Sequence, residues 1–469
     1  MSSLNASLAT ALSGLISEQG ALATTTNNVA NANTPGYSRQ VPVLVSSDPT
    51  VVDPLTFGSG VTLQSIESIR DPILESQIQQ ETQTNGQLNS LVSALQQTQV
   101  NFNSSTGDIG TAITNFFDSV NQLSTNPSDL SLRQGVLTAA GNLATAFNTT
   151  SNNLTAQNAN LDQNVVQSVG QINTLTRQIA QLNGQVSALQ NAGESAGSFI
   201  DQRTQAIDQL SNLVDVSVIP SDNTLTLTTG NGTPLVIGQT AFQLQTQPTL
   251  SGLHDVYSQG TDITSSIVSG ELGGQLQARD RQIPAIQNQL DTLAAGLANA
   301  VNTVQTGGFD LNGNPTGSLS LSGNPQAPVN LFTPPAGVTG AAASLSVAIT
   351  NPALIAASSD GTAGSNGNAE ALYALNGQNV ISGESPTDYY SGIVFDVGNA
   401  TSNATAEQTA SNLVLAQLND QNSAISGVSL DEEAANLVQY QQAYSASAQV
   451  ITAINDMMYA VVNMATLTG

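Results

Sequence analysis

Apolar side chains recur every seven residues at both ends of the 469-residue chain. A seven-residue period sustained over several repeats is typical of a helix that packs lengthwise against other helices. Neither end has enough apolar bulk to form a core alone, so we expect both helices to be buried by pairing or by assembly. The residues expected at this interface are Leu4, Leu8, Leu15, Leu22 and Val29 near the N-terminus, and Leu430, Leu437, Tyr444, Ile451 and Met458 near the C-terminus.

The same pattern would suit an ordinary bundle in which the two terminal helices pair inside one domain. The pattern alone does not separate this arrangement from one completed by neighbouring molecules.

Proline and glycine predict where the helices begin and end. The first helix is expected to stop at residues 31–34, because Pro35 disfavours a helical residue before it and Pro-Gly favours a type II turn. An extended segment over 41–45 follows. Asp71 and Pro72 form a good helix start, with Asp as the N-cap and Pro in the first turn. Helices are expected over residues 72–103, 109–123, 130–189, 199–213, 270–305 and from 404 to the end.

Short apolar segments separated by turn-forming residues begin at Val214 and predict antiparallel strands. A second turn-rich stretch begins at Gly307. The predicted fold class is α+β and multidomain, with terminal helices forming a coiled-coil-like inner domain, a long-helix bundle as the middle domain with a small β insertion, and a β-rich outer module. The expected boundaries are 1–34 and 429–469 for the terminal domain, 35–306 and 402–428 for the middle domain with its insertion at about 214–268, and 307–401 for the outer module.

Charge and composition exclude several classes of function. The chain has 33 acidic residues against 7 Arg and no Lys, and its net charge of −26 would repel nucleic-acid phosphates and anionic lipids. The absence of Cys excludes disulfides and thiolate metal sites. The N-terminus lacks the basic and apolar regions of a cleaved signal peptide. The apolar run 451–467 contains Asn455, Asp456 and Asn463, which are costly in hydrocarbon, so we expect no membrane insertion.

The motifs that could carry catalysis or a metal have simpler structural interpretations. Ser429 and Glu432 form a capping box, and the carboxylates of residues 431–433 suit the positive end of a helix. Asp310 opens a segment that resembles a calcium loop, but Pro315 and Leu321 stand where that loop needs Gly and Glu.

Histidine and the paired charges lead to the same conclusion. His254 is the only histidine, so one chain cannot build a multi-His metal site, and we expect a structural or surface role. Opposite charges at residues 201–203 and 279–281 are expected to form ion pairs along helices. We therefore expect no enzymatic activity, no cofactor and no metal.

The two ends of the chain together resemble the axial proteins of the bacterial flagellum, a family that includes rod, hook and hook-associated proteins. One hallmark is the helix from Ser429 to Ile451, and interior segments such as Arg70-Asp71-Pro72 and Gly273-Gly274 resemble the hook-associated members. The other hallmark follows the first helix and is carried here by Ala32, Asn33, Thr34, Gly36, Tyr37, Arg39 and Gln40.

This resemblance implies a structural protein without catalysis. In the family, the terminal helices line the central channel of the axial tube and pack against neighbouring subunits. The partners it implies are further copies in a ring, the hook protein, the second hook–filament junction protein, and a cytoplasmic export chaperone that binds the C-terminal helix. The location it implies is extracellular, at the hook–filament junction, after type III export without a cleaved signal peptide.

Two other interpretations stay open at this point. A different axial protein, such as the hook, the distal rod or the second junction protein, would share the two ends but not this helical middle. A secreted hydrolase would need two carboxylates that converge in a cleft, and no acid pair in the sequence carries a supporting signature.

Overall fold

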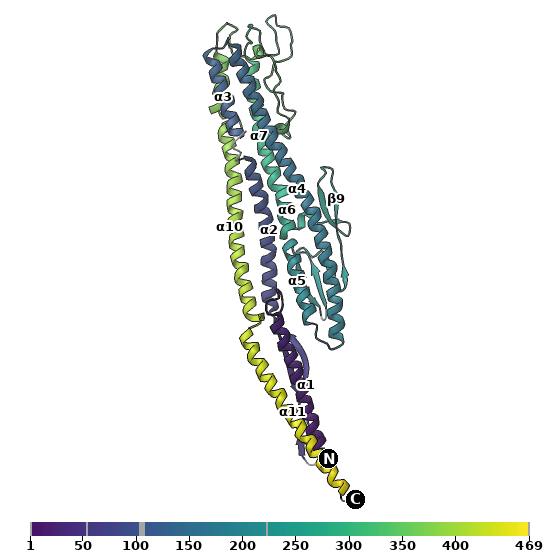
Figure 1. Ribbon diagram of the computed structural model, residues 1–469. Coiled ribbons are helices and arrows are strands. Elements are labelled where there is room, and N and C mark those ends of the chain that lie inside the picture. Colours follow the sequence, from purple (N-terminus) through teal and green to yellow (C-terminus); the bar gives the residue numbers. More distant parts are fainter. Residues whose placement is uncertain (1, 53–54, 103–107, 222–223, 468–469) are drawn as a thin grey trace.

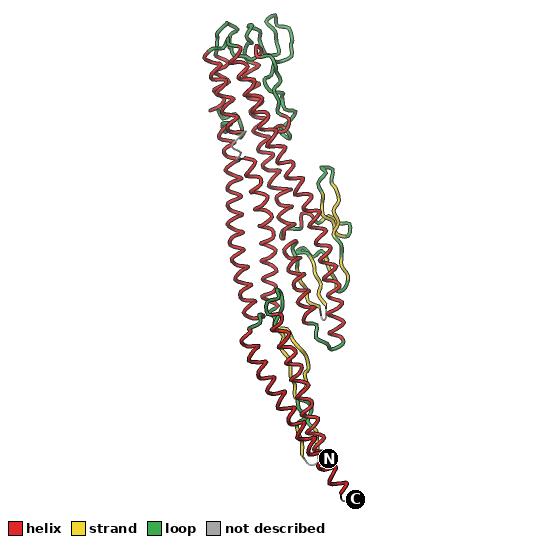
Figure 2. Tube along the Cα trace, viewed as in Figure 1, coloured by secondary structure: helices red, strands yellow, loops and turns green. Residues whose placement is uncertain are grey.

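Long helices run the length of the molecule and give it the shape of a bent rod (Figure 1). The computed structural model describes residues 2–52, 55–102, 108–221 and 224–467. Both chain ends lie at one tip of the rod, and loops from residues 307–385 lie at the other (Figures 1 and 2). Among the described residues, no helix is both long and apolar enough to cross a membrane.

The tip that holds the chain ends, which we call the terminal unit, is built from two antiparallel helices and a β-hairpin. The helices are α1, Ser2–Asn31, and α11, Leu430–Leu467. The hairpin pairs β1, Gln40–Ser46, with β4, Val61–Ser68, and the short strands β2, Thr50–Val52, and β3, Leu55–Phe57, lie at its tip. The hairpin lies along α1, where the Ser17 hydroxyl donates to the Val61 carbonyl at 3.0 Å.

The boundary expected after residue 34 is therefore wrong. Residues 40–68 belong with α1 rather than with the middle domain, because small α1 side chains let the hairpin approach closely. A Cβ at Gly20, for example, would lie 2.5 Å from the Leu63 side chain.

Most predicted helices of the bundle are confirmed to within a few residues. Asp71 caps the first by accepting from the backbone N–H groups of Ile73 and Leu74, and Asp129 caps the longest in the same way. The helices are α2, Pro72–Phe102; α3, Ile109–Thr125; α4, Leu130–Asn191; α5, Gly197–Leu213; α6, Gly270–Gln277; a π-helical turn, Ala278–Gln282; α7, Ile283–Thr306; and α10, Pro386–Ser426.

The predicted β insertion is confirmed as two small antiparallel sheets that pack on α4. In one, β5, Ser217–Ser221, β6, Thr224–Thr228, β7, Pro234–Ile237, and β8, Thr240–Ala241, lie in chain order; in the other, β10, His254–Ser258, lies between β9, Leu244–Pro248, and β11, Thr261–Asp262. Asn173 on α4 holds β9 through both the backbone N–H and C=O of Leu244. Apolar residues of α4, α5, α6 and the strands share one core here.

The predicted β-rich outer module is wrong. Residues 307–385 contain isolated β-bridges, the short helices α8, Ala341–Ser344, and α9, Gly367–Ala374, two 3-10 turns, Pro352–Leu354 and Leu375–Gly377, and irregular loops. Their apolar side chains enter the core of α3, α4 and α7 instead of facing a sheet, and the Phe332 ring lies 5.8 Å from that of Phe116. Buried Arg133 ties these loops to the bundle by donating to the carbonyls of Pro127 and Ile355.

The last bundle helix also begins earlier than expected. Helix α10 starts at Pro386 rather than at residue 404, and the Ser385 hydroxyl accepts from the Asp388 N–H as its N-cap. Residues 386–401 are thus bundle helix, not part of an outer module.

The close crossing of α6 and α2 generates a prediction about stability. A Cβ at Gly274 would lie 2.3 Å from the Gln87 carbonyl oxygen, so Gly274→Ala should destabilise the bundle by about 1–3 kcal/mol. Gly135→Ala, at an exposed α4 position with open space around it, should instead stabilise it by about 0.5–1 kcal/mol. Urea unfolding followed by circular dichroism tests both, and equal shifts of the two variants would contradict this packing.

Candidate functional site: the terminal helices and their joint to the bundle

The seam between α1 and α11 is lined by small and polar residues of α1. A Cβ at Gly14 would lie 3.4 Å from the Ser447 hydroxyl, and Asn28 donates to the Glu433 carboxylate at 3.1 Å. Ala21, halfway between these two α1 positions, is fully buried. The face of α1 directed at α11 therefore repeats every seven residues at positions occupied by small or amide side chains.

The predicted apolar stripe of α1 lies one residue to the side of this seam. Leu4, Leu8, Leu15 and Leu22 are half-buried and Val29 is exposed. On α11, Leu437, Ile451 and Met458 are half-buried, while Leu430 and Tyr444 are exposed. Pairing within the chain thus leaves much of the stripe accessible, and its role in assembly stays a prediction.

The last turns of α11 extend past the first residues of α1 (Figure 1). Near the C-terminal end of α11, Tyr459 is 73% exposed and Val462 is 52% exposed, and Val461 and Met464 are exposed as well. Clustered exposed apolar side chains are typical of interaction sites, so we predict one at this end of α11.

The turn predicted after α1 is confirmed. The Tyr37 N–H donates to the Thr34 carbonyl at 3.2 Å, and Gly36 has the φ of +76° that the third position of a type II turn requires. Asn33, Thr34 and Gly36 are exposed and Ala32 is half-buried. The motif therefore forms a hydrogen-bonded turn at the point where the terminal unit meets the bundle.

Asn28 is the centre of a hydrogen-bond network below this turn. Its Oδ1 accepts from the Tyr37 hydroxyl at 2.8 Å and from the Gln40 N–H at 2.9 Å. Its Nδ2 donates to the Gln40 carbonyl at 2.8 Å and to Glu433 at 3.1 Å. Burial, followed by the charges of Asp201 and Glu433, raises the pKa of Tyr37 to about 12, so the hydroxyl remains a donor at neutral pH.

Arg39 joins the motif to the start of α11. Its Nε donates to Glu433 at 2.7 Å and its Nη2 donates to Glu432 at 2.9 Å. In the structure, the Glu432 side chain therefore pairs with Arg39. The capping box of Ser429 and Glu432 stays a prediction.

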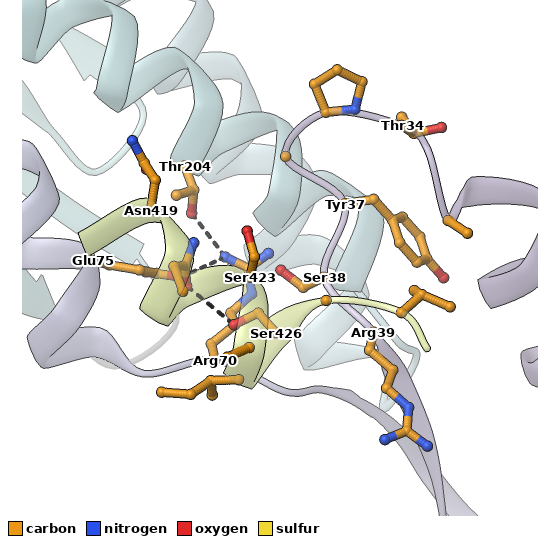
Figure 3. A pocket seen from close by; sticks show the side chains of 18 of the residues that line it. Thr34, Tyr37, Ser38, Arg39, Arg70, Glu75, Thr204, Asn419, Ser423 and Ser426 are labelled. Carbon is orange, nitrogen blue, oxygen red and sulfur yellow. Dashed lines mark hydrogen bonds and ion pairs between the residues drawn. The ribbon is translucent and has the colours of Figure 1, made fainter. Parts of the chain in front are cut away.

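A cleft of about 840 Å³ lies where the terminal unit meets the bundle (Figure 3). Its bundle side holds Arg70, which is ion-paired with Asp201 and with Glu75 at 3.4 Å and donates to the Thr204 hydroxyl at 2.8 Å. The expected pairing of Asp201 with Arg203 within one helix is therefore wrong. Arg70 lies closer to Asp201, because the chain segment that enters α2 passes beside α5.

His254 has the structural role expected of it. Its Nδ1 lies 2.7 Å from the Asp162 carboxylate, which also pairs with buried Arg279 at 2.8 Å. Arg279 pairs with neighbouring Asp280 as well, as predicted. Within the described residues, no group of three or more His, Asp or Glu side chains could hold a metal ion.

Five of the seven arginines, at positions 39, 70, 133, 203 and 279, are buried or half-buried, whereas Arg177 and Arg281 are exposed. The sequence interpretation missed that Glu433 and Asn28 are buried partners. The one available signal for Asn28 was its position one residue before Val29 of the apolar stripe, and Glu433 lies between Leu430 and Leu437 of the second stripe.

Comparison with known proteins identifies the family. Residues 95–319 match the flagellar hook-associated protein FlgK helical domain, residues 8–37 the flagella basal body rod protein family, and residues 421–464 the C-terminal family of the flagellar basal body rod FlgEFG proteins. The flagellar hook-associated protein 1 of Bacillus subtilis is 31% identical over 99% of both chains. That of Escherichia coli is 30% identical over 97% of this chain and 98% of the relative. The chain belongs to the flagellar hook-associated protein 1 family.

Structure agrees with membership of the hook-associated protein 1 family. The flagellar hook junction protein FlgK from Burkholderia pseudomallei aligns with a TM-score of 0.66 at 20% identity, over 75% of this chain and all of that one. This likeness shows a shared fold. As a hook-associated protein 1 family member, the chain is a structural component of the flagellum and not an enzyme.

Asp208, which lines the cleft, should make stability depend on pH. Burial raises its pKa to about 6, although a hydrogen bond from Gln79 opposes the shift. Because this folded-state value lies above that of an unfolded Asp, near 3.9, the stabilising contribution is full below about pH 4 and is lost as pH rises through about 6.

Asp208→Asn keeps an acceptor for Gln79 and mimics the neutral acid. Near neutral pH it should raise the free energy of unfolding by about 1–2 kcal/mol, and the gain should vanish near pH 4. Asp420→Asn, on the exposed side of α10, should change stability by less than about 0.5 kcal/mol. Urea unfolding at both pH values measures this, and a gain that persists at low pH would refute the assignment.

Proposed function

We propose that this chain is a junction subunit that assembles on the end of the hook and connects the hook to the filament through packing of its terminal helices. The observation that carries the proposal is the C-terminal end of α11, which exposes the apolar side chains of Tyr459, Val461, Val462 and Met464. Such a surface is best buried by other subunits. The names of the relatives, which are hook-associated and hook junction proteins, support the place of assembly.

The proposed partners are further copies of the chain in a ring, the hook protein on one side and the second hook–filament junction protein on the other. Before export, a cytoplasmic chaperone would cover the apolar C-terminal helix, and export would proceed without a cleaved signal peptide. The bundle, held as one rod by α4 through two cores, would then carry lateral contacts, and the loops of residues 307–385 would face outward at the far tip.

The match of the relatives along nearly the whole chain favours this role over that of a hook, distal rod or second junction protein. The long helical middle, which matches the FlgK helical domain, supports the same choice.

A substitution on the apolar end of α11 tests the proposal. Val462→Asp should leave the stability of the free subunit within about 0.5 kcal/mol, because the side chain is exposed. In a strain that lacks the wild-type chain, it should give hooks without filaments and free flagellin in the medium, measured by electron microscopy and immunoblotting. Leu250→Asp adds the same charge at a fully exposed turn of the β insertion and should support normal filaments. Normal filaments with Val462→Asp would contradict the proposal.

Salt dependence provides a second test. Helices α1 and α11 carry five acidic residues, Glu18, Asp431, Glu432, Glu433 and Asp456, and no basic residue. Neighbouring copies should therefore repel one another, and screening should relieve this as the Debye length falls from about 10 Å at 0.1 M salt to about 3 Å at 1 M. Self-association measured by sedimentation velocity should strengthen over this range. Weakening would instead indicate that ion pairs between copies drive assembly.

A further inference from the structure

Two chain segments cross between the terminal unit and the bundle. Residues 69–71 lead from β4 into α2, and residues 427–429 lead from α10 into α11. Each link is short, so the direction of the terminal unit depends on what holds these two segments together.

Arg39 belongs to neither segment but is hydrogen-bonded to the first segment and to the residues on both sides of the second. Its carbonyl accepts from the Ile69 N–H at 2.8 Å, and its own N–H donates to the Ser426 carbonyl at 2.8 Å. Its side chain reaches past the second crossing to the first turn of α11, where it binds Glu433 and Glu432. Arg39 therefore binds the end of α10 and the start of α11 at the same time.

The two carboxylates that Arg39 binds differ in burial. The Glu433 side chain is 2% exposed and receives a second hydrogen bond from Asn28, whereas the Glu432 side chain is 56% exposed. A buried ion pair is costly to break, because the remaining partner is left unpaired away from water, and an exposed pair contributes little. The Glu433 contact should therefore dominate the hold of Arg39 on α11.

We propose that Arg39 is the pin of this joint, a positioning residue that, through Glu433, fixes the direction in which α11 leaves α10. Asn28 supports the pin from α1, because it holds both Glu433 and the strand residue next to Arg39. The consequence for assembly rests on the proposed function: with the joint fixed, every subunit presents its apolar α11 end at the same angle. Whether Arg39 fixes the joint can be tested on the free subunit, independently of assembly.

Hydrogen exchange of the free full-length protein tests the pin. Glu433→Gln should accelerate exchange of the amides of residues 434–442 by more than about tenfold, because Gln cannot neutralise Arg39 and turns a donor toward Asn28 or Arg39. Glu432→Gln, the matched variant on the same arginine and in the same helical turn, should change the rates less than about threefold. Amides of residues 405–420 in α10 should keep their rates in both variants. Equal small effects of the two variants would overturn the proposal.

Distance measurements test the direction of α11. Because the chain has no native Cys, spin labels can be placed at Ser402→Cys on α10 and Gln442→Cys on α11, both at exposed positions. Pulsed EPR should give one narrow distance distribution in the wild-type background and with Glu432→Gln, and a broad one with Arg39→Ala or Glu433→Gln. Arg39→Lys keeps the charge and should give an intermediate width. A narrow distribution in every variant would overturn the pin.

The outcome for assembly is separable from that of the pin. If Glu433→Gln loosens the joint but filaments remain normal, Arg39 does fix the direction of α11, but this direction is not needed for assembly. A joint that does not loosen overturns the pin, whatever the filaments look like.

Discussion

Pairing of the two chain ends is the constraint on which the rest of the molecule depends. Helices α1 and α11 are separated by nearly the whole sequence, yet Asn28 and Glu433 lie within hydrogen-bond distance of each other. Everything between them has to leave the terminal unit and return to it at nearly the same point. The chain satisfies this requirement by running out along α2 and α3, back along α4, out again along α5, α6 and α7, and back along α10, with the loops of residues 307–385 at the far tip before the last return.

The same constraint explains why the bundle is thin but continuous. The sequence has few aromatic residues and no Trp, so wide layers would be difficult to fill. The 62-residue α4 instead contributes its first half to one core and its second half to another. Since one helix belongs to both cores, the rod does not need a separate hinge between them.

Helix positions and the β insertion could be predicted because their signals are local. Asp71, Asp129 and the Pro35-Gly36 pair act through their own neighbours, and the structure confirms the helix starts and the turn. The loops of residues 307–385 could not be predicted in this way. Their short apolar runs resemble strands, but Phe332 and its neighbours find partners on helices more than a hundred residues away.

The sequence showed the motif at the joint but not the contacts that its residues make. The residues of the motif turn were identified, but the partners of Arg39 and Tyr37 were not. Glu433 looked like one of three equivalent carboxylates at a helix start, and only tertiary contact separates it from Glu432. Burial of a single carboxylate depends on long-range packing, which periodicity does not encode.

Because most arginines are buried or half-buried, the folded protein should resist proteases outside a cell. Proteases that cleave after basic residues would find Arg177 and Arg281 as the exposed arginines of the folded chain, and both lie within helical backbone. Cleavage there requires local unwinding, because a protease binds an extended segment. With no lysine in the sequence, the folded rod gives this whole class of enzymes almost nothing to cut.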